Sequence, residues 1–137
     1  MANVTSIQVL ENGGTRYVVK VTGILDTSDV AITDLIDTTA AGFQPSNLGR
    51  ETAPTTVAIN RIEYDIEDSL AVNLYWDATA DQLATSLVGR GKLKFDPPMN
   101  NNAGAGKTGK LQYSTQGWVA SAILSFNVTV YCIKTVS

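Results

Sequence analysis

The feature that most constrains this chain is an alternation of apolar and polar residues with a period of two. The clearest alternating stretches are Arg16–Gly23, Ala58–Glu67, Leu70–Trp76 and Trp118–Cys132. A β-strand places successive side chains on opposite faces, so this period is typical of strands with one buried face. The composition agrees, because Thr (16) and Val (13) favour strands and outnumber Glu (4) and Lys (6), which favour helices. These stretches therefore predict strands.

Shorter patterns and turn residues complete the predicted fold. Weaker strands are expected at Val4–Leu10, Val30–Ile36, Gln82–Val88, Lys92–Phe95 and Lys110–Ser114. A short helix at Ala78–Ala84 competes with one of them. Asp68-Ser69 predicts a hairpin turn, and a bend near Ser125–Asn127 divides the last long run. Eight or nine short strands in residues 1–137 predict one all-β domain, an antiparallel β-sandwich with a jelly roll as its narrower form.

Two long connections interrupt the predicted strands, at about residues 37–56 and 97–109. Loops longer than about 12–15 residues are uncommon in compact domains and are usually functional or disordered. The second loop contains Gly106-Lys107-Thr108, but Asn101 stands where a phosphate-binding loop needs its first glycine. The segment after Thr108 alternates as a strand instead of opening a helix. A nucleotide site is therefore not expected there.

Scarce residue types exclude several classes of active site. With no His, the chain has no Ser–His–Asp or Cys–His relay and no histidine metal site. Its single cysteine, Cys132, excludes an intrachain disulfide, and its place on the apolar side of a strand predicts a small buried side chain. We therefore expect no enzymatic activity, no cofactor and no metal. The net charge of −3 argues against nucleic acid as a partner, and no apolar run of about 18 residues predicts a membrane span.

Charge is unevenly distributed along the chain. Residues 1–89 hold 4 basic and 12 acidic side chains (−8), whereas residues 90–137 hold 6 basic and 1 acidic (+5). Arg90, Lys92 and Lys94 share one face of a predicted strand. Such a row either guards a sheet edge against aggregation or docks onto an acidic partner. The charge difference between the two parts adds weight to the docking interpretation, although folding can also bring the two sets of charges together within one subunit.

A second charged strip, formed by Glu63, Asp65 and Glu67, lies on one face of another predicted strand. A solvated or partner-facing strip is favoured over acid–base chemistry, which needs carboxylates that converge from different elements. Trp118 is either a core residue or an exposed contact residue. The candidate partner interface therefore comprises Arg90, Lys92, Lys94, Glu63, Asp65, Glu67 and Trp118.

From Trp76 onward the order of motifs resembles a known family. Trp76–Asp81 leads into a strand, Gly89–Phe95 alternates basic with other residues, and Asn101–Gly109 is a Gly/Asn-rich loop before a β-rich tail. Over Leu70–Lys134 this order resembles head decoration or cement proteins of tailed bacteriophages, whereas the first half is similar only in its β character. The resemblance implies a non-enzymatic β-sandwich that binds outside an assembled capsid and stabilises junctions between major capsid subunits.

The resemblance also implies partners and a location. It implies binding to the major capsid protein, self-association as a dimer or trimer, and a place on the capsid exterior. Met1–Gln8 lacks the pattern of a secretion signal, so synthesis in the bacterial cytoplasm is expected. Two alternatives remain open: another virion component of the tail or neck, and a carbohydrate-binding β-sandwich that stacks sugars on Trp118, Tyr113 and Tyr131.

Overall fold

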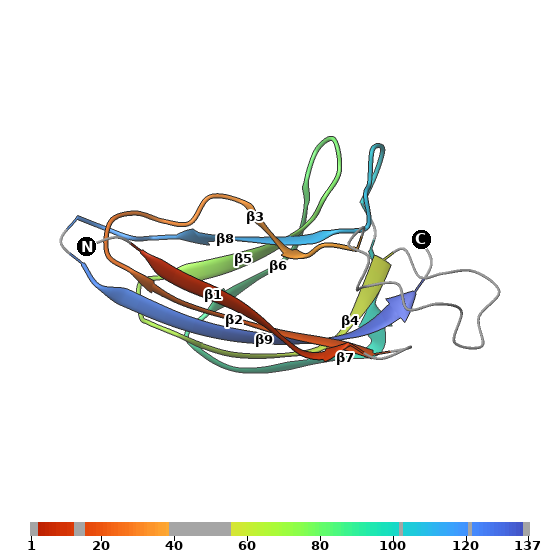
Figure 1. Cartoon of the computed structure of the whole chain (residues 1–137), viewed down its shortest axis with the longest axis horizontal. Coiled ribbons are helices and arrows are strands. Elements are labelled where there is room, and N and C mark those ends of the chain that lie inside the picture. The colour runs from red at the N-terminus through yellow and green to blue at the C-terminus, as the bar shows by residue number, and fades with distance from the viewer. Residues whose placement is uncertain (1–2, 13–15, 39–55, 102, 121, 136–137) are drawn as a thin grey trace.

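The computed structural model describes residues 3–12, 16–38, 56–101, 103–120 and 122–135, and within them it contains nine strands and no helix. The strands are β1 (Val4–Asn12), β2 (Arg16–Leu25), β3 (Thr33–Ile36), β4 (Thr56–Ile66), β5 (Ala71–Trp76), β6 (Gln82–Val88), β7 (Arg90–Met99), β8 (Leu111–Gln116) and β9 (Leu124–Thr135). One antiparallel sheet has the order β1-β2-β9-β4-β7, and the other has the order β3-β8-β5-β6. The sheets pack face to face (Figure 1), which confirms the predicted β-sandwich. No helix in the described part is long and apolar enough to cross a membrane.

β9 lies in the middle of the five-stranded sheet, and its side chains alternate between a buried and an outward side. Phe126, Val128 and Val130 are buried on its inner side, whereas Asn127 and Thr129 lie on its outer side. A strand with one apolar side can pair with neighbours on both edges and still cover a core. β9 accordingly pairs with β2 on one edge and with β4 on the other.

The core lies between the two sheets and takes large side chains from both. Trp76 on β5, Tyr113 on β8 and Phe126 on β9 are all at most 1% exposed, so the prediction that Trp76 belongs to the core is confirmed. The ring centroids of Tyr113 and Phe126 lie 6.3 Å apart. Gly23 on β2 leaves room for one of these rings, because a Cβ there would lie only 2.5 Å from Cε1 of Phe126.

Two predicted connections differ from the structure. Asp68-Ser69 does not close a hairpin, because β4 pairs with β7 and β9 in one sheet while β5 pairs with β6 and β8 in the other. The turn, with Ser69 at a φ of 72°, carries the chain from one sheet to the other. Residues 118–120 and 122, expected within the last strand, instead lie in the connection from β8 to β9. Alternation alone does not tell a strand from a connection of the same parity.

The chain between 77 and 110 also departs from the expectations. The predicted helix at Ala78–Ala84 is wrong, because a loop and the start of β6 occupy those residues. The loop predicted from residue 97 begins later, since β7 continues through Pro97 and Pro98 to Met99. Prolines are tolerated there because β7 is an edge strand and has one side without a ladder partner. Most of the other predicted long loop, residues 39–55, lies outside the described residues.

Two loops project together from the four-stranded sheet at the upper right of Figure 1. They are residues 77–81, between β5 and β6, and residues 103–109, before β8. The amide of Thr79 donates to the carbonyl of Ala105 (3.2 Å), and the hydroxyl of Thr108 donates to the Asp77 carboxylate (2.7 Å). Gly106, at a φ of 78°, allows this close approach to Thr79. Thr108 therefore holds a loop in place, and a strand follows it as predicted.

Candidate interaction surface

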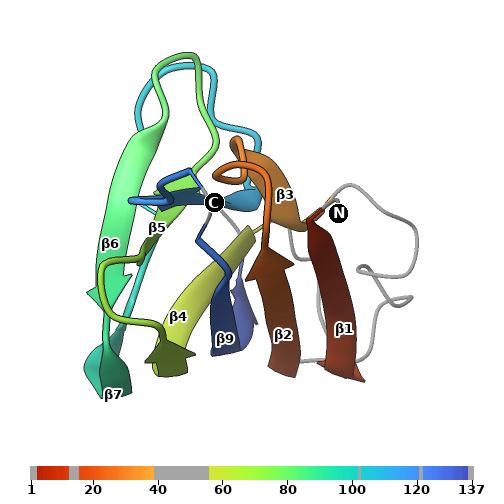
Figure 2. The same cartoon turned by 90° about the vertical axis from the view of Figure 1, so that its left-hand side faces the viewer.

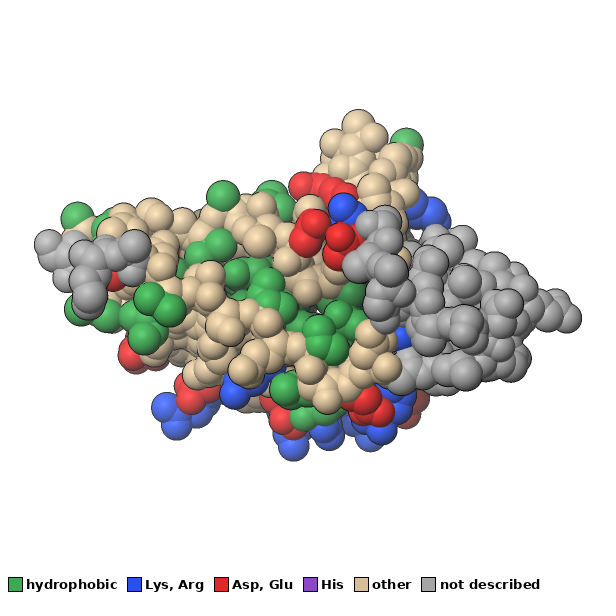
Figure 3. All heavy atoms as spheres, in the orientation of Figure 1, with side chains coloured by type: hydrophobic (Ala, Val, Ile, Leu, Met, Phe, Trp, Pro, Cys, Tyr) green, Lys and Arg blue, Asp and Glu red, His purple; other side chains and the backbone are tan. Residues whose placement is uncertain are grey.

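One face of the five-stranded sheet points away from the other sheet. It carries five of the seven predicted interface residues, and a sixth, Glu67, lies beside it. We call this surface the charged face. It comprises Lys20 and Thr22 on β2, Asn127, Thr129 and Tyr131 on β9, Arg61, Glu63 and Asp65 on β4, and Arg90, Lys92 and Lys94 on β7. Acidic and basic side chains gather along the lower margin of the molecule in Figure 3, which is the side of this sheet.

The strand register brings the two predicted charge strips together within one subunit. β4 and β7 are neighbours, and their outward side chains face one another across the pair. The facing pairs are Arg61 with Lys94, Glu63 with Lys92, and Asp65 with Arg90. The acidic excess of the first part of the sequence and the basic excess of the second therefore meet on one surface. The charged face holds a basic row on β7 (Arg90, Lys92 and Lys94) beside the two carboxylates of β4, and with Arg61 and Lys20 its net charge is +3.

Asp65 and Arg90 form an ion pair at the solvent-exposed end of the charged face. Nε of Arg90 lies 3.5 Å from Oδ1 of Asp65, and the two side chains are 83% and 62% exposed. An ion pair exposed to this degree contributes about 0–1 kcal/mol to stability, because water and salt screen it. The pair therefore orders two charges at the surface more than it stabilises the fold.

Arg61, Glu63 and Tyr131 form a more ordered cluster nearer the middle of the charged face. The guanidinium of Arg61 lies 4.1 Å from the ring centroid of Tyr131 and 3.5 Å from Oε1 of Glu63. The Tyr131 hydroxyl donates to the other carboxylate oxygen of Glu63 at 3.4 Å. Each group contacts both others, so the cluster presents a fixed carboxylate and a fixed guanidinium to a partner.

Lys92 and Lys94 are the exposed cations of the charged face without a close carboxylate. Neither forms an ion pair within 4.0 Å with any described residue. Their strand β7 is the edge of the sheet, with Leu93 and Phe95 partly buried on its inner side. The position is consistent with both interpretations of this row, because an edge strand needs a guard and also gives a partner access.

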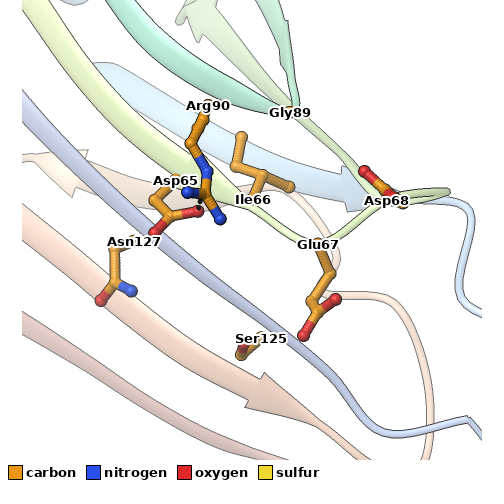
Figure 4. Close-up of a pocket in the computed structure, with 8 residues that line it drawn as sticks. All are labelled: Asp65, Ile66, Glu67, Asp68, Gly89, Arg90, Ser125 and Asn127. Atoms are coloured by element: carbon orange, nitrogen blue, oxygen red, sulfur yellow. Dashed lines mark ion pairs between the residues drawn. The ribbon is translucent and has the colours of Figure 1, made fainter.

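A polar hollow of about 330 Å³ lies at one end of the charged face, where β4 ends and β7 begins. Figure 4 shows Asp65 and Arg90 joined across it, with Glu67 further along the chain beside Ser125. The hollow is lined by Asp65, Ile66, Glu67, Asp68, Gly89, Arg90, Ser125 and Asn127. Gly89, at a φ of 75°, makes the turn that brings the chain into β7, and its carbonyl accepts from the amide of Ile66 at 2.7 Å. Glu67, the third predicted acidic residue, thus lies just past β4 at the rim of the charged face.

Trp118 lies apart from the other six predicted residues, in the connection from β8 to β9. Its side chain is partly buried and packs against the core. Its indole N–H donates to the carbonyl of Ala122 at 3.1 Å, and its backbone amide donates to Oδ1 of Asp29, also at 3.1 Å. These contacts give Trp118 a local structural role, because they hold the connection against the sandwich.

The aromatic residues proposed for sugar stacking do not share a surface. Tyr113 is 1% exposed in the core, and burial raises the pKa of its hydroxyl. Tyr131 lies on the charged face beneath Arg61. Cys132 is 2% exposed, as predicted for a small buried side chain, and burial strongly raises the pKa of its thiol. No group of three or more His, Cys, Asp or Glu residues in the described ranges could hold a metal ion.

Sequence reasoning missed the residues that join the strips into one surface. Thr129 lies between Glu63 on β4 and Lys20 on β2, and Asn127 lies between Asp65 and Thr22. The signal was the outward parity of β9, but nothing in the sequence places β9 between β2 and β4. Comparison with known proteins finds no family model that matches the chain and no curated protein that matches it.

Proposed function

We propose that this protein is a capsid decoration or cement protein that binds the outside of an assembled phage head and stabilises contacts between major capsid subunits. The observation that supports this most is the charged face, an open surface across β2, β9, β4 and β7 with a basic row on β7 beside two carboxylates on β4 at fixed register. Such a surface is suited to binding a protein partner without catalysing a reaction. Complementary charges set the orientation and the association rate of a protein partner more than its raw affinity.

A repeated capsid lattice makes modest contacts sufficient. Exposed charges such as Lys92 and Arg90 contribute little each, but an oligomer that binds several equivalent capsid sites gains avidity without new contacts. The paired loops 77–81 and 103–109 add a second projecting element that can reach a neighbouring subunit. Both features favour a structural role on a large assembly.

We also infer that the sandwich is a jelly roll. The orders β2-β9-β4-β7 and β3-β8-β5-β6 support this inference. In a jelly roll, successive strands pass between the two sheets, and late strands insert beside early ones. The chain crosses in this way at Ser69 and at Gly89, and β8 and β9 pair with β3 and β2. Many virion proteins use this architecture, as do lectins and cupins, so it is compatible with the proposal without singling it out.

Self-association of the protein is proposed to use β1. This strand is an edge of the five-stranded sheet and is exposed at all nine residues. Val4, Ile7, Val9 and Leu10 are 41–65% exposed, and no charged residue occurs from Val4 to Leu10. The opposite edge, β7, carries three cations and two prolines. An unguarded edge of this kind favours pairing with another strand, and Ile7→Lys is expected to shift an oligomer toward monomer in light scattering.

Co-sedimentation with phage shells that lack the protein tests the proposed function. The native protein is expected to pellet with the shells at physiological salt and to saturate at a fixed ratio. Absence of co-sedimentation would refute the proposal. Electron microscopy of labelled particles separates it from the tail or neck alternative, because a decoration protein labels the whole head surface and a tail or neck component labels one vertex or the tail.

A further inference from the structure

Lys134 is a lysine side chain inside the sandwich. It lies on the same side of β9 as Phe126, Val128, Val130 and Cys132, and it is only 2% exposed. Lysine is rarely buried to this extent, because removing an ammonium group from water is costly unless its surroundings compensate. The groups around its amine therefore need a physical explanation.

The amine of Lys134 contacts the side-chain amide of Asn12. Nζ lies 2.5 Å from Oδ1 of Asn12, at the end of β1, across 122 residues of sequence. The ring of Tyr17 covers the same place, with its centroid 5.8 Å from Nζ. A primary amine thus lies against a primary amide beside a buried aromatic ring.

The carboxylate of Asp37 acts on the same tyrosine. Burial raises the pKa of the Tyr17 hydroxyl, and Cys132 and Asp37 raise it further. The Asp37 side chain is 44% exposed and lies 4.0 Å from Nζ of Lys110. An amide exchange needs the amine and the amide, and a carboxylate can assist it by accepting a proton from the amine and returning it to the leaving group.

We propose that Lys134 and Asn12 form an intramolecular isopeptide bond, with Asp37 as the proton relay. Nζ of Lys134 bonds to Cγ of Asn12, and the bond from Cγ to Nδ2 breaks. The amine proton passes through the Asp37 carboxyl group to Nδ2, which leaves as ammonia. One primary amine and one primary amide give one secondary amide and one ammonia, with no oxidant and no co-reactant. Asn12 is an exposed residue, which gives ammonia a path to solvent.

The bond would connect an exposed edge strand to the centre of the sheet. β1 is exposed along its whole length and pairs only with β2, whereas β9 lies between β2 and β4. A link from Asn12 to Lys134 passes over β2 and ties β1 directly to β9. It closes a loop of more than a hundred residues, which restricts the unfolded chain. This inference is independent of the proposed function.

Intact-mass spectrometry of the purified full chain tests the bond. We expect a mass about 17 Da below that of the sequence, the mass of one ammonia, and a branched peptide that joins Asn12 to Lys134 after proteolysis. Lys134→Arg and Asn12→Ala are expected to show their full sequence masses. The matched control Lys20→Arg, an exposed lysine on β2, is expected to keep the deficit.

Two results would overturn the proposal. The first is a native chain that keeps its full sequence mass after prolonged incubation at neutral pH. The second is a deficit that persists in Lys134→Arg, because cyclisation at Asn12-Gly13 also releases ammonia and does not need the lysine. The branched peptide is sought in the native chain, so the test does not depend on the folding of a variant. Asp37→Asn is expected to slow the loss of ammonia at least tenfold, and an unchanged rate would remove Asp37 from the mechanism.

Discussion

Reversing two charges on β7 should separate docking from folding. The change is Arg90→Glu with Lys92→Glu, which places like charges opposite Asp65 and Glu63. Arg90 is 83% exposed and its pair with Asp65 spans 3.5 Å, so the Coulomb energy of that pair in water is about 1 kcal/mol before screening. Exposed pairs of this kind contribute about 0–1 kcal/mol. We expect the free energy of unfolding to fall by about 1 kcal/mol and the circular dichroism spectrum to stay unchanged.

The effect on shell binding should be larger, because each reversal converts attraction to a partner into repulsion. Two reversals at contact distance change the interaction by about 4 kcal/mol in unscreened water. A Debye length of about 8 Å at physiological salt and partial exposure reduce this to about 2 kcal/mol, or roughly thirtyfold in Kd. The loss of affinity in the double variant should become smaller as the salt concentration is raised, since screening weakens both the attraction and the repulsion.

Co-sedimentation over a range of protein concentrations measures this Kd, and two further variants sharpen the result. Lys107→Glu reverses one exposed charge on the projecting loop, away from the charged face, and controls for a change in net charge half as large as that of the double variant. Asp65→Arg with Arg90→Glu restores an internal pair with its polarity exchanged. If the variant with the exchanged pair binds shells with native affinity, the Asp65–Arg90 pair affects only local order. Native affinity in the Arg90→Glu, Lys92→Glu double variant would refute the assignment of the charged face to docking and leave β7 as a guarded edge.

Three further predictions concern the fold. Gly117→Ala should lower the free energy of unfolding by about 2–3 kcal/mol in denaturant titration. The reason is that Gly117 has a φ of 108° and that a Cβ there would lie 2.2 Å from the carbonyl oxygen of Ser69. The control Gly104→Ala, whose Cβ would have no atom within 4 Å, should cost at most about 1 kcal/mol. Cys132 should react with a thiol reagent only after unfolding, because it is buried and its pKa is raised; rapid labelling of the native protein would contradict its position. Stability should begin to fall near pH 9, where the unfolded Cys132 thiol ionises but the buried thiol keeps its proton. It should fall more steeply above about pH 10, where unfolded tyrosines ionise but Tyr17 and Tyr113, whose pKa values are raised by burial, keep their protons; Tyr113→Phe should reduce that second part of the fall.

The alternation of side chains predicted the strands but not their partners. Ile62 and Ile66 are buried while Arg61, Glu63 and Asp65 point outward, as the period of two requires. The same pattern made Asp68-Ser69 resemble a hairpin turn, because a turn between sheets and a turn within a sheet need the same residues. Pairing depends on which inner faces pack together, and that is a property of the whole core.

Local hydrogen bonds decided the cases in which parity failed. Trp118 and Ala122 keep the apolar parity of β9, yet they lie outside it because the indole N–H bonds back to Ala122 and Asp29 accepts from the backbone. Pro97, by contrast, was predicted to lie in a loop but lies in β7, because an edge strand needs no N–H donor on its unpaired side. The first outcome depends on Asp29, which lies 89 residues from Trp118 in the sequence, and the second depends on the place of β7 at the edge of the sheet.

The fold also changes what the charge distribution of the sequence means. A chain with −8 in residues 1–89 and +5 in residues 90–137 suggests two surfaces of opposite sign. Because β4 and β7 are neighbours, Glu63 and Lys92, and likewise Asp65 and Arg90, lie opposite one another, and the remaining cations leave this face with a net charge of +3 instead of two surfaces of opposite sign. What a partner meets at contact is a basic row on β7 beside two carboxylates on β4, at strand spacing. Long-range attraction would act on any partner of opposite charge, whereas such a pattern favours one complementary surface in one register, as a repeated protein lattice can provide.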